Sequence, residues 1–172
     1  MHYSLFKECW NYRTNMLYTN YLVIGSGVAG LTYAVKIAQR FPNKTVIIVT
    51  KADEHESNTK YAQGGVAVVL DLEEDSFQKH IQDTLVAGDG LCDEAVVEMV
   101  IKEGPQRLKE LMLWGASFDI NDSGKLDLGI EGGHSEYRVV HHKDITGFEI
   151  ERALLQQVHK LSNVTVLPHH FA

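Results

Sequence analysis

The sequence predicts an α/β fold in which helices flank a parallel sheet, and three consecutive segments carry that prediction. Residues 21–24 form an apolar run that is typical of a buried parallel strand. Residues 31–40 place apolar side chains at helical spacing, and residues 45–50 form a second apolar run. The apolar helical positions are Leu31, Ala34, Val35 and Ala38. A strand, a helix and a strand in this order make a parallel βαβ unit.

A glycine-rich turn joins the first predicted strand to the helix. Gly25 permits a tight turn, Gly27 lets a pyrophosphate approach the backbone, and Gly30 lets the helix pack closely on the strand. Free N–H groups and the helix dipole at this helix start favour phosphate. The turn therefore predicts a dinucleotide site in a Rossmann-like domain, and a merely structural glycine turn is the alternative. The predicted binding residues here are Gly25, Ser26, Gly27, Val28, Ala29 and Gly30.

The second strand departs from the usual dinucleotide pattern at its end. The usual Asp or Glu, which holds the ribose hydroxyls, is replaced by Thr50-Lys51, and Asp53 and Glu54 come only in the following loop. The basic residue favours a 2′-phosphate and therefore NADP. A flavin enzyme that uses the strand-end hydroxyl and lysine in another way is the competing interpretation.

A polar loop with a glycine pair follows at residues 56–68. Its small hydrogen-bonding residues precede Gly64-Gly65, which allows close approach of the backbone. This pattern suits a backbone that lies against a flat ring. An ordinary glycine-rich turn before a strand is the alternative, and the residues alone do not decide between the two.

Several separated motifs, in order, resemble one flavoprotein family. Besides the turn at 25–30, they are residues 49–51, 57–65, 80–88, 131–135, and 138–141 with 144–147. Over about residues 21–167 the chain resembles the succinate dehydrogenase/fumarate reductase superfamily, and within it the L-aspartate oxidases. The resemblance implies that FAD is the cofactor. The further FAD-binding residues that it implies are Thr50, Lys51, Ser57, Asn58, Thr59, Lys60, Tyr61, Ala62, Gln63, Gly64 and Gly65.

Asn58 separates the two branches of this superfamily. The respiratory dehydrogenases and fumarate reductases carry at this position a histidine that is linked covalently to the flavin. Asn58 has no nucleophilic ring nitrogen, so the resemblance implies that FAD is held non-covalently. A respiratory-type flavoprotein, a dinucleotide-binding module without catalysis and an NADP oxidoreductase are the alternative functions.

The segment 131–135 is a candidate substrate loop. A carboxylate, two glycines and an imidazole suit a loop that meets a small polar ligand, although a surface turn is the alternative from the residues alone. The resemblance implies that Glu131 meets the α-ammonium of the substrate. It also implies that His134 bonds a substrate carboxylate or the flavin surroundings, with Ser135 in the same loop.

The resemblance implies a reaction in which FAD takes a hydride from Cα of L-aspartate and iminoaspartate forms. Dioxygen or fumarate would reoxidise the flavin, and the product would feed quinolinate and NAD synthesis, with quinolinate synthase as a candidate partner. No catalytic residue is expected within the chain, because neither Arg138 nor Arg152 matches the family's catalytic arginine. We expect residues 21–172 to be the N-terminal portion of the FAD-binding domain, without the capping domain and inactive alone.

Composition agrees with a cytoplasmic α/β domain. The net charge of −7 disfavours a general nucleic-acid binder. No stretch approaches the roughly 20 apolar residues of a membrane span. Cys9 and Cys92 form no CxxC motif, and the adjacent histidine pairs at 141–142 and 169–170 would point to opposite faces of a strand. No metal site is therefore predicted.

The rest of the chain predicts three helical segments and a strand. We expect a helix at 77–87 capped by Asp75-Ser76, a helix at 146–161 capped by Thr146, and a strand at 164–167. Residues 93–114 predict two helices that meet at Gly104-Pro105, because proline interrupts helical hydrogen bonds. Residues 1–20, with a second methionine at 16, are an extension without an assigned function. The expected core positions in 93–114 are Val96, Val97, Val100, Ile101, Leu108 and Leu111.

Overall fold

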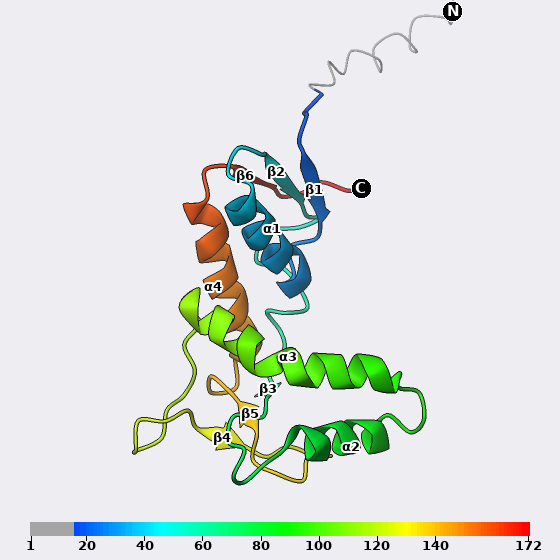
Figure 1. Cartoon of the computed structure of the whole chain (residues 1–172). Coiled ribbons are helices and arrows are strands. Elements are labelled where there is room, and N and C mark those ends of the chain that lie inside the picture. Colours follow the sequence, from blue (N-terminus) through cyan, green and yellow to red (C-terminus); the bar gives the residue numbers. More distant parts are fainter. Residues whose placement is uncertain (1–15) are drawn as a thin grey trace, which may run out of the picture.

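The structure is a computed structural model that describes residues 16–172. Its upper part holds a parallel sheet of β1 (Tyr21–Ile24), β2 (Val46–Val49) and β6 (Val164–Leu167), in the order β1-β2-β6 (Figure 1). The register aligns Val23 with Ile48 and Ile48 with Val166. The predicted α/β fold with a parallel sheet is confirmed. Most of the predicted extension, residues 1–15, lies outside the described residues.

Two helices, α1 (Val28–Arg40) and α4 (Thr146–Lys160), pack side by side against this sheet (Figure 1). The apolar positions expected in the first helix are all buried in the core, together with Val23, Ile48 and Leu154. Two side chains of β1 are open, since Leu22 is 57% and Ile24 69% exposed. The expectation of a fully buried first strand is therefore wrong for the described chain, because helices cover only one face of its sheet.

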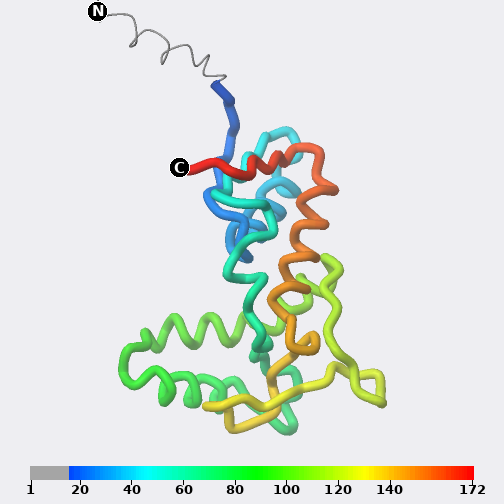
Figure 2. Tube along the Cα trace, turned by 180° about the vertical axis from the view of Figure 1, so that it is seen from behind, coloured from blue at the N-terminus to red at the C-terminus, as the bar shows by residue number. Residues whose placement is uncertain are grey.

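The lower part holds a small antiparallel sheet of two-residue strands and two helices. The strands β3 (Val66–Ala67), β4 (Leu128–Gly129) and β5 (Val139–Val140) pair in the order β3-β5-β4. The helices α2 (Phe77–Ala87) and α3 (Glu94–Leu113) lie beside each other. Residues 50–66 run along α4 from the upper sheet to this lower part (Figure 2). The chain end after β6 lies close to β1, at the upper end of the molecule (Figure 1).

Helix α2 begins as the sequence predicts. The Ser76 side chain accepts a hydrogen bond from the backbone N–H of Lys79, and Asp75 accepts one from the N–H of Ser76. The prediction for α4 is wrong at its cap. Thr146 is the first residue of the helix, and its hydroxyl accepts from the N–H of His142 at 3.0 Å. The threonine therefore closes the turn before the helix and does not cap it.

The predicted break in the third helical segment is also wrong. Pro105 lies inside one continuous helix, α3. Ile101 and Leu108, on either side of the proline, are both buried, so packing outweighs the one hydrogen bond that proline cannot donate. Two expected core residues are open, because Val96 is 50% and Val100 58% exposed. None of the helices within residues 16–172 has the length and apolar character needed to cross a bilayer.

Candidate functional site

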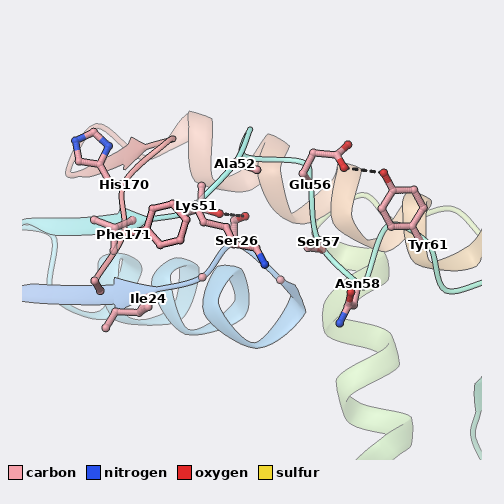
Figure 3. A pocket seen from close by; sticks show the side chains of 15 residues that line it. Ile24, Ser26, Lys51, Ala52, Glu56, Ser57, Asn58, Tyr61, His170 and Phe171 are labelled. Atoms are coloured by element: carbon pink, nitrogen blue, oxygen red, sulfur yellow. Dashed lines mark hydrogen bonds between the residues drawn. The ribbon is translucent and has the colours of Figure 1, made fainter.

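A cavity of about 530 Å³ opens at the carboxyl ends of the parallel strands (Figure 3). The glycine turn after β1 forms one wall, and residues 49–52, at the end of β2 and just after it, form another. Ser26 and Thr50, both buried, join the two walls through a hydrogen bond of 3.1 Å between their hydroxyl oxygens. This edge is where open α/β sheets bind their ligands.

The glycine turn has the geometry that a dinucleotide site requires. Gly25 has φ +99°, which favours glycine, and a Cβ at Gly30 would lie 2.1 Å from the carbonyl oxygen of Gly25. Gly27 precedes α1, whose first hydrogen bond runs from the N–H of Leu31 to the carbonyl of Gly27. The N–H groups of the first turn therefore lack helical acceptors. No acidic residue occupies that turn, so nothing in it repels an anion.

Two residues of the polar loop reach the start of α1. The hydroxyl of Thr59 accepts the N–H of Val28 at 3.0 Å, which satisfies one of the free donors. Asn58 lies between the main cavity and a second one of about 330 Å³, since it lines both. The residues of this second cavity are Ile24, Gly25, Gly27, Val28, Ala29, Gly30, Asn58 and Thr59.

The structure gathers most, but not all, of the predicted FAD residues around these two cavities. Lys51, Ser57 and Tyr61 line the main cavity. Lys60 instead lines a different cavity, beside α4. The carbonyl of Ala62 accepts the N–H of Gly147 at 3.0 Å, at the start of α4.

The glycine pair lies away from both cavities. A Cβ at Gly65 would lie 2.3 Å from Cγ1 of Val139, so this glycine lets the loop pack against β5. A Cβ at Gly64 would lie 3.6 Å from both carboxylate oxygens of Glu131. Gln63 is exposed. The end of the polar loop thus meets the candidate substrate loop and not the cavity at the sheet edge.

Sequence reasoning missed three side chains at the main cavity. Glu56 accepts hydrogen bonds from Lys60 and, at 2.6 Å, from the hydroxyl of Tyr61, and both bonds lower the pKa of its carboxyl (Figure 3). His170 and Phe171 enter from the segment after β6, where the N–H of His170 bonds the carbonyl of Thr50 at 2.9 Å. The predicted strand at 164–167 could have indicated His170 and Phe171, because a parallel strand of the same sheet brings its carboxyl end, and the residues that follow it, to the edge where the cavity lies.

The candidate substrate loop is divided between two environments. Glu131 is exposed beside Gly64. His134 and Ser135 instead face α2. The N–H and the hydroxyl of Ser135 both donate to Asp83 at 2.8 Å, and Nδ1 of His134 lies 3.2 Å from Arg138.

Arg138 is the centre of a buried ion network below this loop. It is fully buried and donates from Nε and Nη2 to the two carboxylate oxygens of Asp75, at 2.8 and 2.7 Å. Its Nη1 donates to Asp83 at 2.5 Å. Burial alone would raise the pKa of Asp83, but the hydrogen bonds from Arg138 and Ser135 outweigh it and lower the pKa to about 2. Burial, together with the charge of Arg138, lowers the pKa of the neighbouring His80.

The histidine pair at 141–142 contacts acidic side chains. Nδ1 of His141 lies 3.1 Å from a carboxylate oxygen of Asp119, and Nδ1 of His142 lies 3.9 Å from the other oxygen. Within residues 16–172, no group of three or more His, Cys, Asp or Glu side chains is arranged to hold a metal ion.

Known proteins with similar sequences identify the family of this chain. The family model described as FAD binding domain matches residues 20–172. A chloroplastic L-aspartate oxidase of Oryza sativa subsp. japonica is 55% identical over 90% of this chain and 23% of its own length. L-aspartate oxidase of Vibrio cholerae is 42% identical over 88% of this chain and 28% of its own length. The chain thus spans about a quarter of these relatives.

Solved structures of related enzymes superpose on this chain. An E. coli quinol fumarate reductase superposes with a TM-score of 0.84 at 31% identity, over 89% of this chain and 26% of that one. Mycobacterium smegmatis Sdh1 in complex with UQ1 superposes with a TM-score of 0.78 at 32% identity, over 87% of this chain and 27% of that one. Because the family model covers most of the sequence, this chain belongs to the FAD binding domain family.

Proposed function

We propose that this chain is part of an FAD-dependent L-aspartate oxidase and that it holds FAD non-covalently at the carboxyl edge of the β1-β2-β6 sheet. Residues 21–172 would form the N-terminal portion of the FAD-binding domain. The observation that carries the proposal is the cavity at that edge, bounded by the glycine turn, the strand-end residue Thr50 and the loop residues 57–58. The identity with L-aspartate oxidases supports the choice of substrate.

The residues at this edge fit a dinucleotide. The first turn of α1 offers free N–H groups without an opposing acidic side chain, which suits a diphosphate. Lys51 and Thr50 follow β2, where the ribose side of a dinucleotide lies in this fold. Asn58 lies between the two cavities, where its amide can both donate and accept hydrogen bonds.

Bound FAD would supply the hydride acceptor for the Cα–H of L-aspartate. The chain's own residues would hold the flavin and orient the substrate. Glu131, which is exposed beside Gly64, would place its carboxylate against the substrate ammonium. Ser135, through its bonds to Asp83 on α2, and His134, through its contact with Arg138, would keep this loop in place, in addition to their predicted role toward the substrate.

The direct test is to purify the protein, measure bound FAD, and assay L-aspartate oxidation with dioxygen or fumarate as acceptor in the whole oxidase. We expect about one FAD per site and production of iminoaspartate. Bound NADPH without flavin would favour the NADP alternative that Lys51 suggests. Oxidation of succinate in place of L-aspartate would favour the respiratory-type alternative.

Acid precipitation should release all of the flavin. Asn58 occupies the position at which the covalent relatives carry histidine, and an amide cannot form that bond. The measurement is flavin fluorescence in the supernatant and in the protein band of a denaturing gel. Fluorescence that stays with the denatured band would contradict non-covalent binding.

In the whole oxidase, Glu131→Gln should weaken the binding of L-aspartate by about tenfold, because a charge-assisted hydrogen bond to the ammonium is lost. Succinate carries no ammonium, so its inhibition constant should change much less. Both constants are measured in the wild type and in the variant. An equal loss for the two ligands would mean that Glu131 serves the structure of the loop and does not recognise the amine.

A cytoplasmic location and a partnership with quinolinate synthase are further predictions. The rice relative is chloroplastic, so fractionation of the source cells is the relevant measurement for location. Iminoaspartate is a reactive imine, and an enzyme that consumes it directly is the kind of partner that this product favours. Co-purification under native conditions tests that partnership.

A further inference from the structure

The Ser57 hydroxyl lies between two cavities. Ser57 lines the main cavity at the sheet edge, which the proposed function assigns to FAD. Its hydroxyl donates to Oε1 of Glu151 on α4 at 2.7 Å. Glu151 lines a separate cavity of about 450 Å³ between α4 and residues 54–60. One hydrogen bond therefore connects the two cavities.

This arrangement fixes what Ser57 can offer a ligand. A hydroxyl has one proton to donate and two lone pairs that accept. The proton of Ser57 goes to Glu151, and one lone pair accepts the N–H of Thr59 at 3.1 Å. Only a lone pair is left for the main cavity. In this state Ser57 is an acceptor toward any ligand there.

Glu151 is a carboxyl group in an unusual setting. It is only 2% exposed, and among the described residues its Oε2 has no hydrogen-bond partner although that atom is buried. Burial raises the pKa of Glu151, against the lowering effects of the Ser57 hydrogen bond and of the charges of Lys60 and His55. Glu56 adds to the rise. The other charged or titratable groups around this cavity are Glu54, Arg152 and His159.

We propose that Glu151 is a positioning residue that sets the direction of the Ser57 hydroxyl proton. When the carboxyl of Glu151 takes up a proton from solvent, its O–H can donate to Oγ of Ser57. The Ser57 proton then turns toward the main cavity by rotation about the Cβ–Oγ bond, and no covalent bond of Ser57 breaks. Ser57 changes from an acceptor to a donor toward the ligand. The inference rests on the proposed function for the identity of that ligand.

The direction of the effect on FAD follows from the groups that FAD presents. Its diphosphate oxygens only accept hydrogen bonds, and its flavin ring presents several acceptor atoms and a single N–H, so a donor from Ser57 is the better match. We therefore expect FAD to bind more tightly below the pKa of Glu151 than above it. The expected change in Kd is about fivefold, which corresponds to one net hydrogen bond of ordinary strength.

The first experiment uses the chain without FAD. The carboxyl carbons of glutamate are labelled with ¹³C, and the Glu151 signal is assigned by its loss in Glu151→Gln. We expect Glu151 to titrate above the ordinary range of glutamate. In Ser57→Ala its pKa should rise further, because the hydroxyl that stabilises the carboxylate is gone. An ordinary pKa that Ser57→Ala leaves unchanged would overturn the proposal.

The second experiment measures the Kd for FAD by flavin fluorescence from pH 5 to pH 9. Wild type should bind more weakly as the pH passes the Glu151 pKa found by NMR. Glu151→Gln imitates the protonated acid, because its amide donates to Ser57, and should bind tightly throughout the range. Ser57→Ala should bind weakly throughout. Glu98→Gln, an exposed glutamate on α3, is the matched control and should keep the wild-type profile.

The outcomes of the two experiments are separable. A pH transition that persists unchanged in Glu151→Gln, or tighter binding at high pH, would overturn the proposal. Absence of FAD binding in the wild type at every pH would count against the proposed function, while the NMR titration still decides whether Glu151 and Ser57 exchange roles as hydrogen-bond donor and acceptor. Circular dichroism of each variant checks that the fold is retained.

Discussion

Replacement of Gly27 by valine should leave the chain folded and raise its Kd for FAD by at least about tenfold, a loss of about 1.4 kcal/mol of binding free energy. The backbone of Gly27 has φ −75° and ψ 178°, which any residue can adopt. A Cβ there meets side-chain atoms of Thr59 and Ser57 at 3.5 and 3.9 Å, which are ordinary contact distances. The added side chain instead occupies the space through which a pyrophosphate reaches the N–H groups of α1.

Gly30→Ala provides the contrast, because its effect should be on folding. A Cβ at Gly30 would lie 2.1 Å from the carbonyl oxygen of Gly25, so the backbone of the turn must move. We expect a loss of about 3 kcal/mol in the free energy of unfolding, near the upper end for single substitutions in a packed core. Urea unfolding of both variants, followed by circular dichroism, separates the two effects.

Full FAD affinity in Gly27→Val would show that the dinucleotide does not approach the glycine turn, and the site assignment would be wrong. Unfolding of Gly27→Val would show instead that valine is too large for the contact with Thr59. Gly27→Ala, whose single Cβ the measured distances accommodate, then takes its place in the binding measurement.

The parts of the fold that the sequence predicts well are those in which neighbouring residues carry the whole signal. The helix at α1 has its apolar stripe within one run, and Gly25 and Gly30 each meet a constraint set by the same turn. The strands of the small antiparallel sheet were not predicted. Each has only two residues, so no alternation of side chains can appear in the sequence.

Other features depend on residues that are distant in sequence. Pro105 stays within α3 because Ile101 and Leu108, on the turns before and after it, are both buried, and periodicity alone does not weigh that burial against a proline. Glu151 meets Ser57 across 94 residues. Only the placement of α4 beside the polar loop brings them together, so no local pattern marks Glu151 as part of the site.

The buried ion network below the candidate substrate loop should give the largest loss of stability of any substitution considered. Arg138→Leu is expected to lower the free energy of unfolding by about 3–5 kcal/mol at pH 7, because it leaves Asp75 buried without its partner. Arg138 joins β5 to the start of α2, so its loss also removes its contacts with His134 and Ser135. Urea unfolding measures the loss.

The pH dependence of this loss has a definite sign. The network lowers the pKa of Asp83 from 3.8 to about 2, and it also lowers the pKa of Asp75. An acid whose pKa is lower in the folded state stabilises the fold above its unfolded pKa, and that contribution disappears as the pH falls through the folded value. Wild type should therefore lose stability between about pH 4 and pH 2. In Arg138→Leu this contribution is absent, so the difference in unfolding free energy between wild type and variant should shrink as the pH falls through that range.

Two further variants decide whether charge or packing causes the loss. Arg107→Leu removes an exposed arginine that pairs with Glu103 and Glu110 on α3, and it should change the stability far less. The double variant Asp75→Leu/Arg138→Leu removes both members of the buried pair, so it should recover part of the loss of Arg138→Leu. The double variant is compared with the losses measured for Asp75→Leu alone and Arg138→Leu alone. If its loss of unfolding free energy equals the sum of those two losses, the destabilisation comes from the cavity that the long side chains leave. An unpaired carboxylate would then not be its cause.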